Sequence, residues 1–339
     1  MTLADRVVAA WYAPRLTPLA ALLWPLSVPF RVVVALRRLL FRAGVLRATK
    51  MPVPVVVVGN LTAGGAGKTP LTCALAEALR ERGFRPGIVS RGYGGRAPGP
   101  RAVAPGDDPR DVGDEPPILA ATGFPVWIGR DRVAAAHGLL AAHPDCDVVL
   151  CDDGLQHYRL ARNVEIAVVD AARGFGNGCL LPAGPLREPR SRLDDVDAVV
   201  RLVAGDAPRA AAGDARTTTM TYVPLPWRNL RDPGLAADPR QWEGREVHAI
   251  AGIGHPQRFF ALVRSLGIAA TEHAFADHHA FTAGDLAYPG AAAILMTQKD
   301  AVKCTRLADG RAWYLPLRAV LEPALPALVE TKIRGSQTA

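Results

Sequence analysis

The chain has 339 residues, of which 49% are hydrophobic and 21% charged, so it is long enough for two domains and too apolar for a disordered or fibrous protein. Its net charge of +8 is concentrated in the first 50 residues, which carry eight Lys and Arg side chains and one acid. The remainder is nearly neutral, which argues against a nucleic-acid partner. Five cysteines without a CxxC pair argue against a disulfide framework or a zinc ribbon and are typical of a reducing compartment.

The first 45 residues combine this basic charge with the most apolar stretch of the chain, Leu16–Leu36. Three prolines interrupt the stretch (Pro18, Pro25 and Pro29), whereas a helix that spans a membrane needs about 20 apolar residues in a row. We therefore predict that residues 1–45 form a monotopic or re-entrant anchor on an anionic membrane surface. The alternative is a peripheral helix that packs on the protein's own core.

After residue 45, short β-branched runs alternate with helical patterns, which is typical of an α/β protein with a mostly parallel sheet flanked by helices. The valine run Val53–Val58 predicts a buried strand, and apolar residues at helical spacing predict a helix from Pro70. Further strands are predicted at Gly87–Ser90, Val126–Ile128, Asp147–Cys151, Val164–Val169 and Ala198–Leu202. These elements define a core at 46–210.

A stretch rich in Ala, Gly, Pro and Asp, Ala204–Ala215, is interpreted as a linker. It is followed by a second α/β pattern, with strands predicted at Glu246–Ala251, Ala293–Met296 and Trp313–Leu315 and a helix at Pro256–Leu266. We therefore predict a smaller C-terminal α/β domain at 211–330.

The strongest motif is the glycine-rich segment Gly59–Pro70, which lies between the valine strand and the helix after it. Strand, glycine-rich loop and helix are the context of a Walker A motif, whose backbone N–H groups surround phosphate oxygens. In this motif Lys68 reaches the β- and γ-phosphates and the Thr69 hydroxyl binds Mg²⁺. The chain departs from the strict pattern at Thr62, where a glycine is expected. The predicted nucleotide-binding residues here are Thr62, Ala63, Gly64, Gly65, Ala66, Gly67, Lys68 and Thr69.

Acidic residues follow the strand at Asp147–Cys151, where Asp152 and Asp153 are typical of a Walker B element that places a carboxylate beside the metal. Two adjacent acids suggest a divided role. Another acidic pair, Asp114 and Glu115, precedes Pro116, and the alternative for this pair is an ordinary helix cap. The loop after the second strand contains Arg91 and Tyr93 at the carboxyl end of the sheet, where α/β proteins contact their substrates.

Together these motifs resemble those of the tetraacyldisaccharide 4′-kinases of the lipid A pathway in Gram-negative bacteria. The resemblance extends from the apolar N-terminus to about Pro316. It is carried, in order along the chain, by Gly59–Pro70, Ser90–Gly94, Gly113–Pro116, Asp152–His157, Pro182–Pro189, Gly252–Phe260, Asp277-His278 and Thr297–Lys303.

The resemblance implies a P-loop lipid kinase that uses ATP and Mg²⁺ to phosphorylate the 4′-hydroxyl of tetraacyldisaccharide 1-phosphate at the cytoplasmic face of the bacterial inner membrane. It implies Asp114 as the base, assisted by His278 from the second domain, with Lys68 and Asp153 also catalytic. Metal ligands would be Thr69, Glu115 and Asp152, and Lys299 and Asp300 would contact the nucleotide. Substrate contacts would come from Arg91, Tyr93, Gln156, His157 and Arg187, with Arg190 and Arg192 as further candidates for the 1-phosphate.

Two other hypotheses stay open at this point. A P-loop GTPase or ATPase of the metallochaperone type is suggested by the Walker A motif and by Thr297–Asp300, which is similar to a base-binding motif of GTPases. The scattered cysteines and the apolar N-terminus argue against it. A membrane scaffold that binds nucleotide without catalysis is the other alternative, and dependence of ATP turnover on a lipid acceptor would separate the three.

Overall fold

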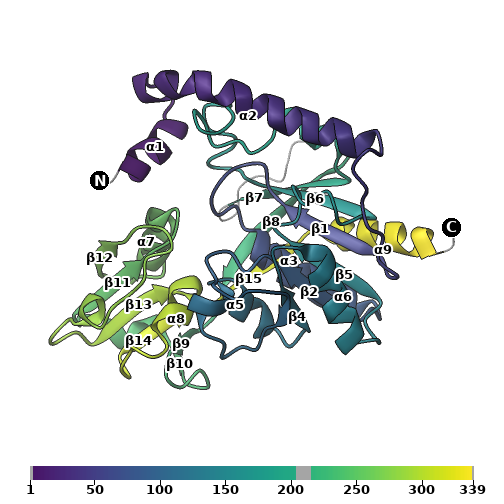
Figure 1. Ribbon diagram of the computed structural model, residues 1–339. Coiled ribbons are helices and arrows are strands. Elements are labelled where there is room, and N and C mark those ends of the chain that lie inside the picture. Colours follow the sequence, from purple (N-terminus) through teal and green to yellow (C-terminus); the bar gives the residue numbers. More distant parts are fainter. Residues whose placement is uncertain (1–2, 204–214, 338–339) are drawn as a thin grey trace.

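The computed structural model describes residues 3–203 and 215–337 (Figure 1). Two sheets flanked by helices form the body of the molecule, and one long N-terminal helix lies along its top. The predicted α/β class, with a mostly parallel core sheet, a smaller C-terminal α/β unit and an N-terminal helix, is confirmed.

The larger sheet has nine strands, and all neighbours are parallel except at its two edges. The order is β15 (Leu317–Leu321), β8 (Thr217–Pro224), β7 (Ala198–Leu202), β6 (Val164–Asp170), β1 (Val55–Gly59), β5 (Val148–Asp152), β2 (Pro86–Ser90), β4 (Val126–Ile128) and β3 (Arg101–Ala102). The consecutive strands β5 and β6 lie on opposite sides of β1. Loops that follow strands at such a reversal of winding form the usual ligand site of α/β sheets.

Side chains alternate along β1 because successive residues of a strand point to opposite faces. Val56 and Val58 pack on one side, under α3 (Lys68–Glu81) and α9 (Ala324–Gln337). Val55 and Val57 pack on the other side, under α6 (Arg132–Ala142) and the segment beneath the N-terminal helix. The strand is therefore buried on both faces, which explains its continuous run of valines.

The smaller sheet has six strands in the order β10 (Ala236–Ala237), β9 (Trp227–Asn229), β14 (Ala312–Leu315), β13 (Ala293–Thr297), β11 (Val247–Ala251) and β12 (Thr271–Ala274). Helices α7 (Pro256–Ser265) and α8 (Gln298–Cys304) flank it. Three tryptophans, Trp227, Trp242 and Trp313, meet edge to face in its core. The short helices elsewhere are α4 (Pro109–Val112), α5 (Pro116–Ala120) and 3₁₀ turns at Arg190–Asp195, Pro239–Trp242 and Gly284–Leu286.

The strands divide between the two sheets differently from the predicted boundary at residue 210. Strand β8 pairs in parallel with β7, and β15 pairs antiparallel with β8, so both extend the larger sheet. The chain thus leaves the larger sheet after Pro224 and returns to it after Pro316. Pairing between strands about a hundred residues apart leaves no local pattern in a sequence. Residues 204–214 of the predicted linker lie outside the described residues.

The N-terminal segment folds into α1 (Leu3–Trp11) and α2 (Pro18–Arg42). Helix α2 has 25 residues and continues through Pro25 and Pro29, so the prediction that prolines break it was wrong. Both prolines lie on its exposed side, where a missing backbone N–H leaves no buried gap. By length and composition alone, α2 is the one helix in the described part of the chain that could cross a membrane.

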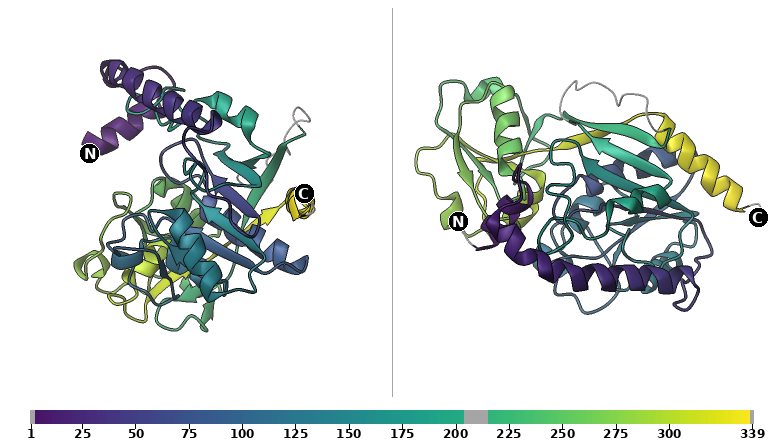
Figure 2. Two further views of the ribbon diagram at one scale, coloured as in Figure 1. Left: turned by 45° about the vertical axis from the view of Figure 1, so that its right-hand side comes forward. Right: turned by 90° about the horizontal axis from the view of Figure 1, so that it is seen from above.

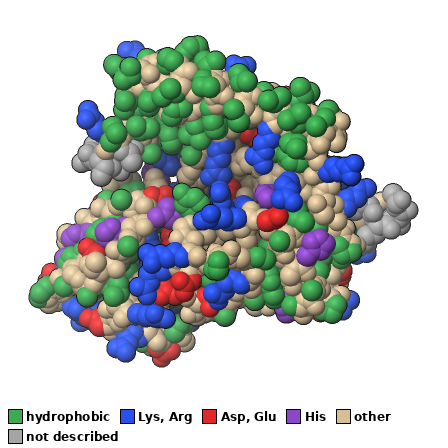
Figure 3. Space-filling view, viewed as in Figure 1, with side chains coloured by type: hydrophobic (Ala, Val, Ile, Leu, Met, Phe, Trp, Pro, Cys, Tyr) green, Lys and Arg blue, Asp and Glu red, His purple; other side chains and the backbone are tan. Residues whose placement is uncertain are grey.

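The two sides of α2 differ sharply. Its outer side exposes a continuous apolar surface, which forms the top of the molecule in Figure 3 and consists mainly of Leu22, Trp24, Leu26, Val32, Val33, Leu36 and Leu39. The inner side carries Ser27, which is buried and hydrogen-bonded twice: its hydroxyl donates to the Leu180 carbonyl (2.9 Å) and accepts from the Ala183 N–H (3.2 Å). From α1, the Trp11 indole donates to the Pro182 carbonyl (2.8 Å). Both helices are therefore fixed to one segment, residues 176–187.

Candidate active site

The glycine-rich loop after β1 adopts the conformation that its glycines permit. Gly64 and Gly67 have φ of 98° and 92°, in the left-handed region that L-residues avoid. A Cβ at Gly67 would also lie 2.6 Å from the Tyr222 hydroxyl, so no side chain fits there. Thr62 is not left-handed; its backbone instead pairs with Leu186, which explains why a threonine replaces the expected glycine.

This pairing attaches the loop to the segment beneath the N-terminal helices. The Ala63 N–H donates to the Pro185 carbonyl and the Arg187 N–H donates to the Leu61 carbonyl, each over 2.7 Å. The first half of the P-loop is therefore held as an extended strand against residues 185–187. Its second half, from Gly64 to Gly67, remains free to surround phosphate.

Lys68 begins α3, and its buried ammonium lies 3.7 Å from Asp153. The Arg187 guanidinium lies 3.1 Å from the same carboxylate, and Arg132 donates to the Asp153 carbonyl over 3.1 Å. Burial favours the neutral acid, but Lys68, Arg187 and Arg132 together outweigh it and lower the pKa of Asp153. Asp153 is therefore a carboxylate that holds the lysine and one predicted substrate residue in place.

Asp152 is fully buried and accepts hydrogen bonds from the hydroxyls of Thr69 (3.1 Å) and Thr72 (3.0 Å). Burial, and then the nearby Glu115 carboxylate, raise its pKa to about 7. Among the described residues, no three His, Cys, Asp or Glu side chains are placed to hold a metal ion by themselves. Mg²⁺ is usually held by one or two carboxylates together with nucleotide phosphates, and this pairing of a hydroxyl with a buried carboxylate fits that donor set.

Asp114 and His278 lie in loops beside different sheets, and their side chains are in contact. Asp114 lies between α4 and α5 beside the larger sheet, and His278 lies in the loop after β12 of the smaller one. A hydrogen bond of 2.8 Å links His278 Nδ1 to Asp114 Oδ2. Burial opposes ionisation of Asp114, but the hydrogen bond from His278 and the charge of Lys303 outweigh it and lower the pKa of the carboxyl. The pair is therefore a proton acceptor oriented by a histidine.

Lys299 adds a second link between the sheets. Its ammonium at the start of α8 lies 3.8 Å from Glu115 and 3.5 Å from Asp277. Burial tends to lower the pKa of this lysine, but the two carboxylates raise it, so it stays charged. Lys299 thus lies beside Glu115, which is itself near Asp152 and the P-loop. This position is compatible with the predicted contact between Lys299 and the nucleotide.

Asp300 is placed differently from its neighbour. It is fully buried, accepts from the Gly252 N–H (3.1 Å) and the Thr297 hydroxyl (2.7 Å), and lies 2.8 Å from the Lys303 ammonium. These bonds join the loop after β11 to the start of α8. In this position Asp300 presents no surface to a nucleotide.

Four of the five predicted substrate residues occupy two walls of the site. Gln156 donates to the Asn60 carbonyl beside the P-loop (3.1 Å), and Arg187 lies against Asp153. On the opposite wall Tyr93 is exposed and its ring centroid lies 5.5 Å from that of His278, with the Arg91 guanidinium 5.9 Å above the Tyr93 ring.

The fifth predicted substrate residue, His157, and the further candidates for the 1-phosphate, Arg190 and Arg192, lie off these walls. His157 is partly buried, and burial followed by the Arg132 charge lowers its pKa to about 4, so it is neutral at neutral pH. Arg190 stacks on Phe175, with 4.5 Å between the guanidinium and the ring centroid. Arg192 is buried against Glu165. Neither arginine points into the space between Asp114 and the P-loop pair of Lys68 and Asp153.

Sequence reasoning missed two residues of the site. Arg132 is 5% exposed and braces Asp153; its only local signal is Asp131, which caps α6 by accepting from the Val133 N–H. Tyr222 lies on β8 behind Gly67, and burial raises its pKa. No signal for Tyr222 exists near the P-loop in the sequence, because the contact depends on how β8 joins the sheet.

Comparison with known proteins identifies the family of the chain. A model of the tetraacyldisaccharide-1-P 4′-kinase family matches residues 19–334. The tetraacyldisaccharide 4′-kinase of Chromobacterium violaceum is 51% identical over 322 residues, 93% of this chain and 94% of that protein. That of Azoarcus sp. is 51% identical over 304 residues, 89% of this chain and 88% of that protein.

Among solved structures, the "apo" form of LpxK from Aquifex aeolicus, crystallised in complex with ATP, superposes with a TM-score of 0.77 at 28% sequence identity. The match covers 93% of this chain and 99% of that one. With a family match over nearly the whole chain and relatives that are half identical in sequence, the protein belongs to the tetraacyldisaccharide-1-P 4′-kinase family.

Proposed function

We propose that the protein transfers the γ-phosphate of ATP to the 4′-hydroxyl of tetraacyldisaccharide 1-phosphate, a step of lipid A biosynthesis. The observation that carries this proposal is the 2.8 Å contact between Asp114 and His278, which joins the proposed base to the histidine that orients it. Glu115, the neighbour of Asp114, lies close enough to the P-loop acid Asp152 to raise the pKa of that carboxyl. Membership of the kinase family and the ATP complex of the related Aquifex aeolicus structure support the same activity.

In this mechanism the P-loop binds the nucleotide and Asp114 activates the acceptor. Lys68 reaches the β- and γ-phosphates from the start of α3, where the helix N-terminus also favours negative charge. The acceptor hydroxyl gives its proton to Asp114 as its oxygen attacks the γ-phosphorus, and the bond to the bridging oxygen breaks, so that ADP leaves with the electron pair. His278 orients the carboxylate through its Nδ1 contact and positions it for the hydroxyl.

Mg²⁺ belongs to this proposal as well. The Thr69 hydroxyl and the Asp152 carboxylate would hold it, with Glu115 next to them, because these are the oxygen donors beside the P-loop lysine. When bound, the ion neutralises part of the phosphate charge. Asp153 would not bind the metal but would hold Lys68 and Arg187 in position, since it pairs with both.

The membrane part of the proposal rests on α2. A substrate with four acyl chains stays in the bilayer, so the enzyme must bring its site to the interface. The exposed apolar side of α2 and the basic side chains around it suit the anionic cytoplasmic face of the bacterial inner membrane. This location places the enzyme where both ATP and the lipid are accessible.

The test uses purified protein with γ-labelled ATP, Mg²⁺ and detergent-solubilised tetraacyldisaccharide 1-phosphate. We expect label in the lipid, and a loss of at least a hundredfold in Lys68→Ala, because a phosphate-binding charge disappears. Lys50→Ala, an exposed lysine outside the site, should transfer label at the normal rate. Label that appears only as free phosphate, whether or not lipid is present, would instead support a nucleotide hydrolase of the metallochaperone type.

A further inference from the structure

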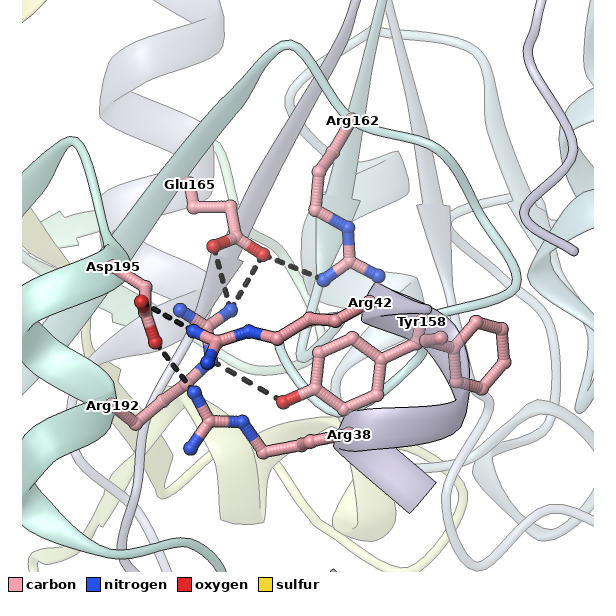
Figure 4. A pocket seen from close by; sticks show the side chains of 8 residues that line it. Arg38, Arg42, Tyr158, Arg162, Glu165, Arg192 and Asp195 are labelled. Atoms are coloured by element: carbon pink, nitrogen blue, oxygen red, sulfur yellow. Dashed lines mark hydrogen bonds and ion pairs between the residues drawn. The ribbon is translucent and has the colours of Figure 1, made fainter. Parts of the chain in front are cut away.

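A second polar pocket lies away from the candidate active site, beneath the C-terminal half of α2. Figure 4 shows it from close by, and its volume is about 220 Å³. Its walls come from three parts of the chain: α2, the segment 158–165, and the 3₁₀ turn before β7. The lining residues are Arg38, Phe41, Arg42, Tyr158, Arg162, Glu165, Arg192 and Asp195.

Positive charge exceeds negative charge in this wall, with four arginines against two acids. Arg192 is the deepest of them, with a side chain only 3% exposed. Its Nη2 donates to both Glu165 oxygens over 2.6 Å, and its Nε donates to the Tyr158 hydroxyl over 3.3 Å. Its Nη1 is buried and has no hydrogen-bond partner among the residues that the structure describes. A buried guanidinium nitrogen without an acceptor points to a ligand that supplies one.

The mouth of the pocket is formed by Arg38 and Arg42, one helical turn apart on α2. Both donate to Asp195, each over 2.5 Å, and the Arg42 side chain is 62% exposed. Two guanidinium groups that share one partly exposed carboxylate have donors to spare. An anion that enters can therefore be bound from the mouth without breaking the contact of Arg192 with Glu165.

The floor of the pocket also supports the loop that carries two predicted substrate residues. Arg162 donates to the carbonyls of Leu155 (3.0 Å) and His157 (2.5 Å), and Tyr158 donates to the buried Glu188. Glu188 in turn accepts from Gln156 over 3.1 Å. The pocket wall and the substrate loop are therefore one hydrogen-bonded unit, although the pocket opens toward α2.

We propose that this pocket binds the phosphate group of an anionic membrane phospholipid, at a site separate from those of the nucleotide and the acceptor. Guanidinium groups bind phosphate through paired N–H donors, and arginines in this pocket provide such pairs. A lipid head group is favoured over a free anion because the mouth lies on α2, beside its exposed apolar surface (Figures 3 and 4). The inference rests on the proposed membrane location of α2.

The experiment measures binding to the full chain in a non-ionic detergent by calorimetry, with three probes: dihexanoylphosphatidylglycerol, dihexanoylphosphatidylcholine and inorganic phosphate. We expect saturable binding of the phosphatidylglycerol alone. Arg42→Gln should weaken it about tenfold or more, because a charge-assisted hydrogen bond is lost. Arg31→Gln removes an exposed arginine from the same helix outside the pocket and should change the affinity less than twofold.

A further variant is expected to bind phosphatidylglycerol more tightly instead of more weakly. Asp195→Asn frees Arg38 and Arg42 from their carboxylate partner, so it should tighten the binding of phosphatidylglycerol. Equal binding of inorganic phosphate would overturn the lipid assignment in favour of a free-anion site. Equal binding of phosphatidylcholine, which carries no net charge, would show that the acyl chains and not the anionic head group drive binding. Equal losses in Arg42→Gln and Arg31→Gln would reduce the effect to general surface charge. Either result would overturn the pocket.

These outcomes are separate from those of the kinase assay. Label transfer in detergent needs neither phospholipid probe, so failed transfer with intact phosphatidylglycerol binding would reject the kinase and keep the pocket. Normal label transfer without phosphatidylglycerol binding would support the kinase and reject the lipid pocket.

Discussion

Asp114 faces two demands that its surroundings reconcile. As the proposed base it would have to stay ionised to accept a proton, and yet it is partly buried at the junction of the two sheets. The hydrogen bond from His278 and the charge of Lys303 lower its pKa enough to keep the carboxylate ionised at neutral pH. This makes Asp114 a base of low intrinsic strength, whose efficiency depends on its position relative to the hydroxyl.

Replacing this carboxylate by an amide therefore tests the proposed base. We expect Asp114→Asn to reduce kcat by about 10² to 10⁴, the usual contribution of a general base, and to leave the dissociation constant for ATP unchanged. Label transfer and equilibrium ATP binding measure the two quantities. Asp111→Asn, an exposed acid in the preceding helix, is the control and should behave as wild type. Normal turnover in Asp114→Asn would remove this residue as the base.

Asp152 predicts a pH dependence of the magnesium requirement. Burial and Glu115 raise its pKa to about 7, so below pH 7 it is mostly protonated and unable to bind a cation. The ionised fraction falls about tenfold from pH 8 to pH 6. We therefore expect the Mg²⁺ concentration for half-maximal transfer to rise about tenfold over this range, measured at saturating ATP. A requirement that is the same at both pH values would contradict Asp152 as a ligand.

For single site residues, the sequence was informative where the contacts are between neighbours in the chain. It was uninformative where the contacts join distant segments. The P-loop and the acids after β5 follow directly from strand ends and glycine spacing, whereas a role for the Asp114–Glu115 pair was implied only by the family resemblance. Asp300 resembled a nucleotide-binding residue, but its carboxylate accepts from Gly252, about fifty residues earlier in the chain. Such a role depends on the packing of β11 against β13, which spacing alone does not reveal.

Among the elements, α2 departs most from expectation. Its prolines suggested a broken segment, because proline removes a backbone hydrogen bond and disfavours helix at the preceding residue. Thr17 caps the helix by accepting from the Ala20 N–H, and Pro18 occupies a first-turn position where its ring is tolerated. The contacts of the inner side with residues 180–183 stabilise the rest of the helix. Tertiary packing therefore overrides the local preference.

The outer side of α2 makes a direct prediction about membranes. We expect the double substitution Leu22→Glu and Val33→Glu, both on exposed side chains, to release the protein from phospholipid vesicles, because two charges would have to enter the bilayer interface. Sedimentation with vesicles measures the bound fraction. Leu307→Glu places a charge on an exposed leucine of the C-terminal unit and should leave sedimentation unchanged. Unchanged sedimentation of the double variant would reject the anchor.

For the whole molecule, the two sheets meet through a few polar contacts that surround the site. Besides Asp114 with His278, Arg258 of α7 lies 3.3 Å from Asp170 at the end of β6, and Arg173 donates to the Gly254 carbonyl over 3.3 Å. Both views in Figure 2 show the smaller sheet beside the larger one, with α1 next to it. The proposed base is therefore complete only when the sheets are in contact.

The arrangement of the sheets was the least predictable level. Six of the nine strands of the larger sheet and three of the six strands of the smaller one were predicted within one or two residues, since β-branched runs mark most of them. The boundary at residue 210 nevertheless failed to separate the sheets, because β8 and β15 join the larger one from beyond it. Pairing of distant strands is decided by the balance of burial over the whole fold, and it has no signature in composition.

The segment 176–187 has a consequence for how far the enzyme reaches. It is bonded on one side to Trp11 and Ser27 of the N-terminal helices and on the other to the P-loop through Ala63 and Arg187. If α2 lies in the membrane surface, as proposed, the transferable phosphate is held at a fixed height above the bilayer. An acceptor would then be phosphorylated only if its hydroxyl reached that height while its acyl chains stayed in the bilayer. Such an enzyme would select its lipid by how far the hydroxyl extends from the bilayer, as well as by the shape of the sugar.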